Sequence, residues 1–87
     1  MKLQIRSLLA RIGEISATPE ALPDAADLHE AGLSSYGTVE LMVALEEEFG
    51  VEFPDTLLTH ATFGSIDSVA AAVAGLLGRP DAARDAA

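Results

Sequence analysis

The chain contains no cysteine, so neither a disulfide framework nor a thiolate metal site can form. No apolar run reaches the ~18 residues that a membrane-spanning helix requires. The amphipathic N-terminus, residues 1–6, also lacks the continuous apolar core of a signal peptide. These absences lead us to expect a cytoplasmic protein that neither inserts into membranes nor holds a metal ion.

Basic residues are scarce and confined to the two ends of the chain. The formal net charge is −9, and the segment between residues 12 and 78 holds twelve acidic residues and no lysine or arginine. Such a surface repels nucleic acid and anionic lipid and attracts proteins with basic patches. The same charge also suits a surface that only keeps the protein soluble. Its self-repulsion is expected to strain the fold, so salt or mild acidification should raise the melting temperature.

Apolar spacing predicts an all-α fold, a small bundle of three longer helices and one short helix with a long first connection. The expected helices cover about residues 3–15, 35–49, 56–61 (the short one) and 66–77. Four apolar residues of the connection are expected to pack on the core: Leu22, Ala26, Leu28 and Leu33. Residues 1–78 form one domain in this prediction, and residues 79–87 form a frayed tail.

Helix caps can also be read from the sequence. Gly50 and Gly78 are the expected stops of the second and last helices. Asp55 is expected to cap the short helix, and Ser65 the last one.

The groups that a free-standing enzyme needs are missing. Residues 32–36 (GLSSY) superficially suggest a nucleophile elbow, but they depart from G-x-S-x-G and no predicted strand precedes them. His29 and His60 are each expected to be exposed, and neither belongs to a zinc motif. The acidic residues do not follow the spacing of a calcium loop. We therefore expect a protein that is not itself an enzyme.

The helix predicted at 35–49 has two different faces. Its core stripe consists of Leu41, Met42, Leu45 and Phe49. Val39 and Val43 fall outside this stripe and lie among glutamates. Scattered apolar residues are common on protein surfaces. This strip begins at Ser35, however, which favours a contact surface with an acidic rim.

The helix order, the long connection and a serine at the start of an acidic second helix together resemble the acyl carrier protein family. The resemblance covers about residues 3–77 and is closest in TVEL (38–41), ALEEEF (44–49) and PD (54–55). It implies that the serine at the start of the second helix, Ser35, carries a 4′-phosphopantetheine arm, derived from coenzyme A, as a phosphodiester. The thiol of that arm holds activated acids as thioesters. Ser34 would cap or line the turn instead.

The resemblance also implies which residues meet partner proteins. These are Val39, Glu40, Val43, Glu46 and Glu47. The expected partners are a phosphopantetheinyl transferase and a loading ligase or acyl transferase with a basic patch. The carrier itself is expected to be a monomer. A phosphodiester at a helix N-terminus would meet unpaired N–H groups and the positive end of the helix dipole.

Departures from the family pattern bear on the cargo. Fatty-acid carriers have Asp-Ser-Leu around the modified serine, whereas this chain has Ser-Ser-Tyr at 34–36, and Gly37 replaces a further acidic position. GLSSY at 32–36 and FPDTLL at 53–58 are closer to stand-alone aminoacyl carriers. Those carriers are loaded by amino acid:carrier-protein ligases that resemble truncated class II aminoacyl-tRNA synthetases. A specialised fatty-acyl or polyketide carrier is the main alternative, and an unmodified acidic interaction module is the alternative from another class.

Overall fold

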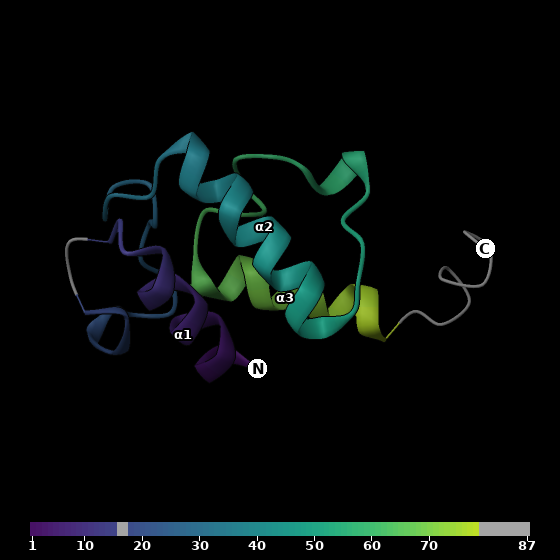
Figure 1. Cartoon of the computed structure of the whole chain (residues 1–87), viewed down its shortest axis with the longest axis horizontal. Helices are drawn as coiled ribbons and strands as arrows, with labels where there is room; N and C mark the ends of the chain where they lie inside the picture. The colour runs from purple at the N-terminus through teal and green to yellow at the C-terminus, as the bar shows by residue number, and fades with distance from the viewer. Residues whose placement is uncertain (16–17, 79–87) are drawn as a thin grey trace.

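The computed structural model describes residues 1–15 and 18–78. Within these ranges the chain forms three α-helices and no strand (Figure 1). The helices are α1 (Lys2–Ile12), α2 (Ser35–Phe49) and α3 (Ile66–Leu77). The prediction of an all-α fold with three longer helices is confirmed. The tail predicted at 79–87 lies outside the described residues.

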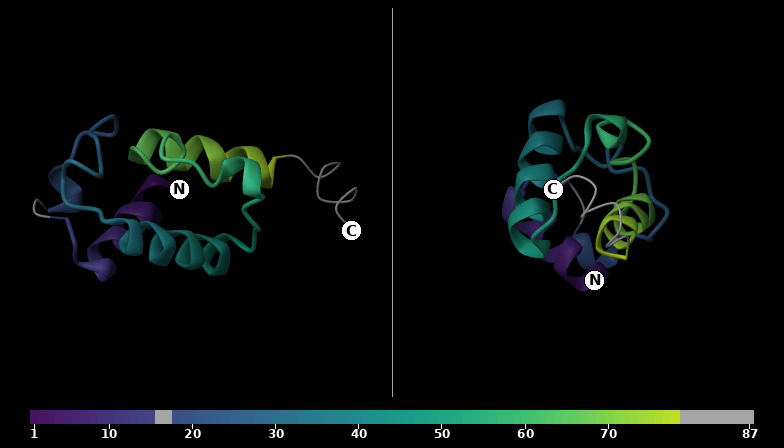
Figure 2. Two further views of the ribbon diagram at one scale, coloured as in Figure 1. Left: turned by 90° about the horizontal axis from the view of Figure 1, so that it is seen from above. Right: turned by 90° about the vertical axis from the view of Figure 1, so that its right-hand side faces the viewer.

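The three helices contact one another around a single core, and α1 runs roughly opposite in direction to α2 (Figure 2). Each helix contributes the apolar face that its spacing predicts. The fully or nearly fully buried side chains are Ile5, Leu8 and Leu9 of α1, Leu41 and Leu45 of α2, Ile66, Val69, Ala70 and Val73 of α3, and Leu28, Leu33, Phe53 and Phe63 of the connections. The rings of Phe53 and Phe63 lie 5.4 Å apart between centroids. The connections therefore complete the core that the helices begin.

α1 ends at Ile12, earlier than the predicted boundary near residue 15. Gly13 adopts a left-handed conformation, with φ of 77°, and its N–H donates to the Leu9 carbonyl at 3.1 Å. This is a common way for a helix to stop, because glycine reaches positive φ without steric strain. Ile15 still packs against the core, although it lies beyond the helix.

The short helix predicted near 56–61 is a single 3-10 turn, η2 (Asp55–Leu57). The expectation that Asp55 caps it is wrong, because Asp55 is its first residue and no side chain caps the turn. Beyond η2, the Thr59 hydroxyl accepts the N–H of Thr62 at 3.1 Å. Such local side-chain hydrogen bonds offer the backbone an alternative to helix, which explains why the turn does not continue.

α3 begins and ends as predicted. Ser65 accepts the N–H of Ser68 at 3.0 Å, and the Ser68 hydroxyl in turn accepts the N–H of Ser65 at 3.0 Å. This reciprocal pair is a capping box. Gly78 follows the last helical residue.

The connection between α1 and α2 contains one 3-10 turn, η1 (Pro19–Ala21), and is fastened to the rest of the molecule. Leu28 and Leu33 are buried, as predicted. The N–H of Leu28 donates to the carbonyl of Gly64 at 2.8 Å, and the N–H of Asp67 donates to the carbonyl of Asp24 at 2.9 Å. These contacts tie the connection to the start of α3 and thereby fix the point at which α2 begins.

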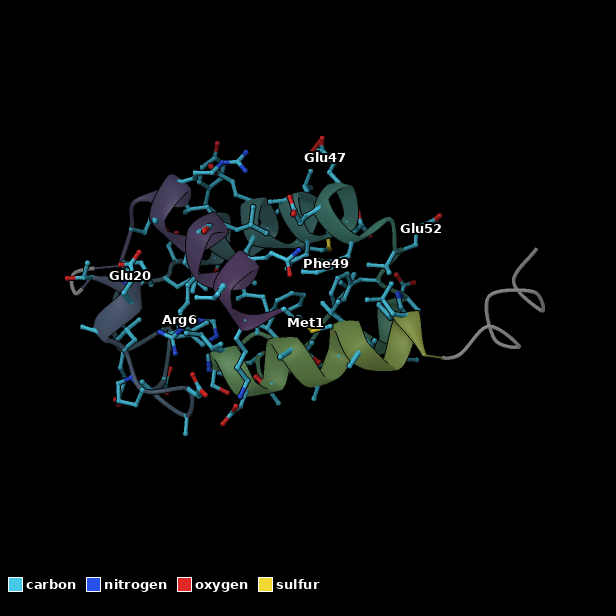
Figure 3. The ribbon with its side chains drawn as sticks, turned by 90° about the horizontal axis from the view of Figure 1, so that it is seen from below. Met1, Arg6, Glu20, Glu47, Phe49 and Glu52 are labelled. Atoms are coloured by element: carbon cyan, nitrogen blue, oxygen red, sulfur yellow. The ribbon has the colours of Figure 1, made fainter. Side chains whose placement is uncertain are left out.

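Arg6 of α1 also binds the connection between α1 and α2 (Figure 3). Its guanidinium donates to the carbonyls of Pro19 and Leu22, the second at 2.8 Å, and forms an ion pair with Asp24. Only 14% of the Arg6 side chain is exposed. A largely buried arginine thus donates to two carbonyls of the connection, of which that of Pro19 also accepts the N–H of Leu22.

Lys2 of α1 also reaches acidic residues of the middle segment. Its ammonium lies 3.0 Å from Asp24 and 2.7 Å from Asp67. The idea that the central acids lack basic partners is therefore wrong for these two carboxylates. Salt screens this attraction as well as the repulsion among the other carboxylates. These two effects on stability oppose each other, so we no longer expect added salt to raise the melting temperature strongly.

Candidate functional site

Two adjacent serines at the start of α2 have different environments. Ser34 is the N-cap, and its Oγ accepts the N–H of Gly37 at 3.0 Å. Ser35 is the first helical residue and is exposed, and its hydroxyl has no hydrogen-bond partner among residues 1–15 and 18–78. The expectation that Ser34 caps the turn is confirmed, and Ser35 presents a free hydroxyl to solvent.

Glu14, which sequence reasoning did not single out, reaches the same end of α2. Its Oε1 accepts the N–H of Ser34 at 2.9 Å. The Ser34 hydroxyl lies 2.9 and 2.8 Å from the two oxygens of the Glu14 carboxylate and donates to it. A carboxylate is favourable at this position because it faces the positive end of the helix dipole.

The space for this carboxylate exists because residue 37 is glycine. A Cβ atom added to Gly37 would lie 1.9 Å from Glu14 Oε1 and 2.9 Å from Leu33 Cδ1. The structure therefore puts a carboxylate from the end of α1 where the family pattern has an acidic side chain on α2. The sequence contains one hint of this arrangement, because Gly37 stands where the family pattern has an acidic residue. No spacing rule links that position with Glu14.

The hydrogen bonds from Ser34 lower the pKa of the Glu14 carboxyl below its ordinary value of 4.5. The ammonium of Lys2, followed by Arg6, lowers the pKa of Asp24 below 3.8. A depressed pKa stabilises the fold above the unfolded-state pKa, and this contribution is lost as the pH falls through the folded-state value. We expect the melting temperature, followed by circular dichroism, to fall as the pH drops below about 4, opposing the gain from neutralising unpaired acids.

The Glu14→Gln variant separates the two effects, because it removes one depressed carboxyl and keeps the shape of the side chain. Its melting temperature should fall less steeply below pH ~4 than that of the wild type. Glu52→Gln is the matched control, since Glu52 is exposed and its side chain points away from the helices (Figure 3). Parallel curves for wild type and Glu14→Gln would contradict the assignment.

Tyr36 extends from the helix beside the free serine and is 72% exposed. A hydrogen bond to Glu40, one turn further along α2, raises the pKa of the Tyr36 phenol. Tyr36 and Glu40 form a polar edge next to Ser35.

Val39 and Val43 are exposed by 55% and 44%, as the helical spacing predicts. They belong to a hollow of about 530 Å³ between α1 and α2. Its lining residues are Leu8, Arg11, Ile12, Val39, Glu40, Val43, Ala44, Glu47 and Glu48. We call this region the α1–α2 hollow. It has an apolar floor, several glutamates on the α2 side and Arg11 on the α1 side.

Glu46 has a different environment from the other predicted partner residues. It does not line the α1–α2 hollow. Its Oε2 accepts the N–H of Phe53 at 2.9 Å, which ties the segment after α2 back to the helix. The Glu46 carboxylate therefore stabilises the segment after α2. The other four predicted partner residues line the hollow: Val39, Glu40, Val43 and Glu47.

The expectation for the histidines is right for His60, which is exposed, and wrong for His29, which is half-buried. The two rings stack with centroids 3.8 Å apart, and His29 Nδ1 lies 3.3 Å from the carbonyl oxygen of Leu33. Side-chain stacking across two loops covers His29, an arrangement that neither loop reveals alone. In the part of the chain that the structure describes, no group of three or more His, Cys, Asp or Glu side chains is arranged to hold a metal ion.

An exposed serine, whose hydroxyl is unpartnered within the described residues, begins an acidic second helix on a small helical bundle, an arrangement typical of a carrier domain. Residues 4–73 match the family described as "Phosphopantetheine attachment site", and the chain belongs to this family. Its prosthetic group is 4′-phosphopantetheine, held covalently. The structure fits this group, because the exposed Ser35 hydroxyl is unpartnered within the described residues.

Known proteins resemble the chain over most of its length. An aminoacyl carrier protein of Agrobacterium fabrum is 41% identical over 83 residues, which are 95% of this chain and 100% of that protein. A D-alanyl carrier protein of Bacillus velezensis is 40% identical over 63% of this chain and 69% of its own length.

A similar solved structure is the complex of an engineered Bradyrhizobium japonicum glycine:[carrier protein] ligase with carrier protein from Agrobacterium tumefaciens and AMP. It matches with a TM-score of 0.80 and 42% identity, over 84% of this chain and 97% of the matched chain. Among the described residues, no helix is long and apolar enough to cross a membrane.

Proposed function

We propose that this protein is an aminoacyl carrier whose 4′-phosphopantetheine arm is attached to Ser35. The arm's thiol holds an amino acid as a thioester and presents it to partner enzymes. The observation that carries this proposal is the free Ser35 hydroxyl at the start of α2, in a chain that belongs to the phosphopantetheine attachment family. The chain supplies position and recognition, and the chemistry is that of the arm and of the partner enzymes.

Attachment requires coenzyme A and a phosphopantetheinyl transferase. The Ser35 oxygen attacks the phosphorus that bears the pantetheine, and a new P–O ester bond forms. The bond from this phosphorus to the bridging pyrophosphate oxygen breaks, and 3′,5′-ADP leaves with the electron pair. The serine proton passes to a base. Intact-mass measurement after incubation with both components tests this step, and an unchanged mass would support the alternative of an unmodified interaction module.

The aminoacyl cargo is supported by the similarity to carriers named for aminoacyl and D-alanyl groups. An amino acid:carrier-protein ligase is the loading enzyme that fits, because a similar carrier appears in complex with a glycine:[carrier protein] ligase. Incubating the modified protein with that Bradyrhizobium ligase, ATP and glycine should add one glycyl group by mass. Loading by a fatty-acyl ligase but by no aminoacyl ligase would favour the fatty-acyl or polyketide alternative.

We further propose that partners dock on the α1–α2 hollow. Val39 and Val43 provide exposed apolar contacts, and Glu40 and Glu47 provide the acidic rim. Desolvated apolar contacts give affinity, while complementary charges mainly steer encounter. A partner surface with a few apolar side chains flanked by lysine or arginine fits this region. Glu46 does not line this hollow, and its carboxylate accepts the N–H of Phe53.

Replacing Glu47 with lysine is expected to slow loading by the ligase several-fold, chiefly through the association rate. The Glu47 side chain points away from the helix bundle, so the substitution leaves the core intact (Figure 3). Added salt should slow loading of the wild type by screening the same attraction. Initial loading rates measured across salt concentrations check both expectations.

Glu52→Lys is the matched control, because it makes the same charge change outside the α1–α2 hollow. It should load at nearly the wild-type rate. If both variants slow ligase loading equally, only the net charge of the protein matters. If neither variant slows loading, the acidic face serves only to keep the protein soluble. We also propose that residues 1–78 form a single carrier domain, which acts as a monomer in the cytoplasm.

A further inference from the structure

The first turn of α2 is already occupied by a carboxylate. Both oxygens of Glu14 engage the Ser34 hydroxyl, and one also accepts the Ser34 N–H. Ser34 in turn uses its Oγ as the acceptor for the N–H of Gly37. The N–H and hydroxyl of Ser34 and the N–H of Gly37 are therefore partnered on either side of Ser35.

The space beside this turn is also filled. A side chain at residue 37 would collide with the Glu14 carboxylate, at 1.9 Å from Oε1 and 2.7 Å from Cδ. Glu14 thus takes the volume that Gly37 leaves open. Because Glu14 binds Ser34, the residue directly before Ser35, a phosphodiester attached at Ser35 would approach a fixed negative charge if it folded toward this end of the helix. Because like charges repel at short range, the phosphate is favoured elsewhere.

We propose that Glu14 is a positioning residue for the prosthetic arm: its carboxylate keeps the phosphodiester on Ser35 off the first turn of α2 and directs the arm into solvent. This inference rests on the proposed attachment at Ser35. It replaces the simpler expectation that the arm's phosphate itself binds the positive end of the helix.

An arm held off its own domain has a functional consequence. A partner enzyme must take the thiol into its active site, and only arms that are free of the carrier are competent for this. An arm bound to the carrier for part of the time lowers the apparent affinity of the partner by the competent fraction. Glu14 therefore keeps the arm available without touching the thioester.

The test compares the unmodified and modified forms of wild type, Glu14→Ala, Glu14→Gln and the control Glu52→Gln. Amide ¹H–¹⁵N spectra report the hydrogen bonds of Ser34 and Gly37, and ³¹P relaxation reports the mobility of the phosphate. In the wild type and in Glu52→Gln, modification should leave both amides nearly unchanged and the phosphate mobile. In Glu14→Ala, modification should shift the Ser34 amide several-fold more and slow the phosphate.

Glu14→Gln separates charge from shape, because the amide keeps an acceptor oxygen near Ser34 but removes the negative charge. It should also slow the phosphate, and its spectrum serves if the alanine variant does not fold. Peptide mapping by mass spectrometry establishes the attachment site first. If the arm lies on another residue, the proposed function and this inference both fail. If it lies on Ser35 and both Glu14 variants match the wild type, only this inference is overturned.

Discussion

Replacing Ser35 with alanine is expected to abolish incorporation of phosphopantetheine completely, and aminoacyl loading with it. The reason is chemical, because the phosphodiester forms on the Ser35 oxygen and alanine has none. The fold should survive, since Ser35 is exposed and its hydroxyl makes no hydrogen bond within the described residues. Intact mass after incubation with coenzyme A and a phosphopantetheinyl transferase measures the first effect, and circular dichroism the second.

Ser34→Ala is the matched control, since it removes the neighbouring hydroxyl instead. It should still accept the arm, but it loses the cap on Gly37 and the hydroxyl contact with Glu14. Loss of a serine N-cap costs about 1 kcal/mol, or roughly 4–8 °C in melting temperature for a domain of this size. The two serines should thus separate function from stability. A persisting mass increase in Ser35→Ala would falsify the assignment.

The parts of the fold that depend on local pattern could be predicted from the sequence. Apolar residues at helical spacing fix which face of α2 enters the core and leave Val39 and Val43 outside it. Glycine and serine mark helix ends by backbone chemistry that does not depend on distant residues, as at Gly50 and Ser65. The position of Ser35 at the first turn follows from these local signals.

Contacts between residues far apart in the chain could not be predicted in this way. Glu14 meets Ser34 across twenty positions, and Arg6 meets Asp24 across eighteen. Both contacts depend on how α1 lies against the long connection, which periodicity does not specify. The prediction of an exposed His29 failed for the same reason, because its cover is His60 from another loop. The sequence therefore predicted the serine at the start of a helix, but it did not predict that the Glu14 carboxylate lies beside it.

Replacing Arg6 with methionine is expected to produce the largest loss of stability among the charged residues of α1, because Arg6 is the largely buried one. Methionine keeps the apolar stem but leaves the carbonyl of Leu22 without the Arg6 donor, whereas the carbonyl of Pro19 keeps the N–H of Leu22. Leaving a buried acceptor unsatisfied costs about 1–3 kcal/mol. For the unpaired Leu22 carbonyl and the lost contacts to Pro19 and Asp24 together we expect a loss of roughly 2–4 kcal/mol, since water can reach part of the site. Thermal unfolding should show a melting temperature lower by about 10–20 °C.

Arg11→Met is the matched control, because it makes the same substitution and charge change in the same helix. Arg11 is exposed and lines the α1–α2 hollow, so its replacement should change the melting temperature little. Hydrogen exchange gives a second, local measurement. The amide of Leu28 lies in the connection and donates to the Gly64 carbonyl before α3, and it should exchange faster in Arg6→Met than in Arg11→Met. Similar melting temperatures and exchange rates for the two variants would show that Leu28 and Leu33 hold the connection by burial alone. A selective loss in Arg6→Met would show that the connection leading to Ser35 is held in place by an arginine nearly thirty positions earlier in the chain.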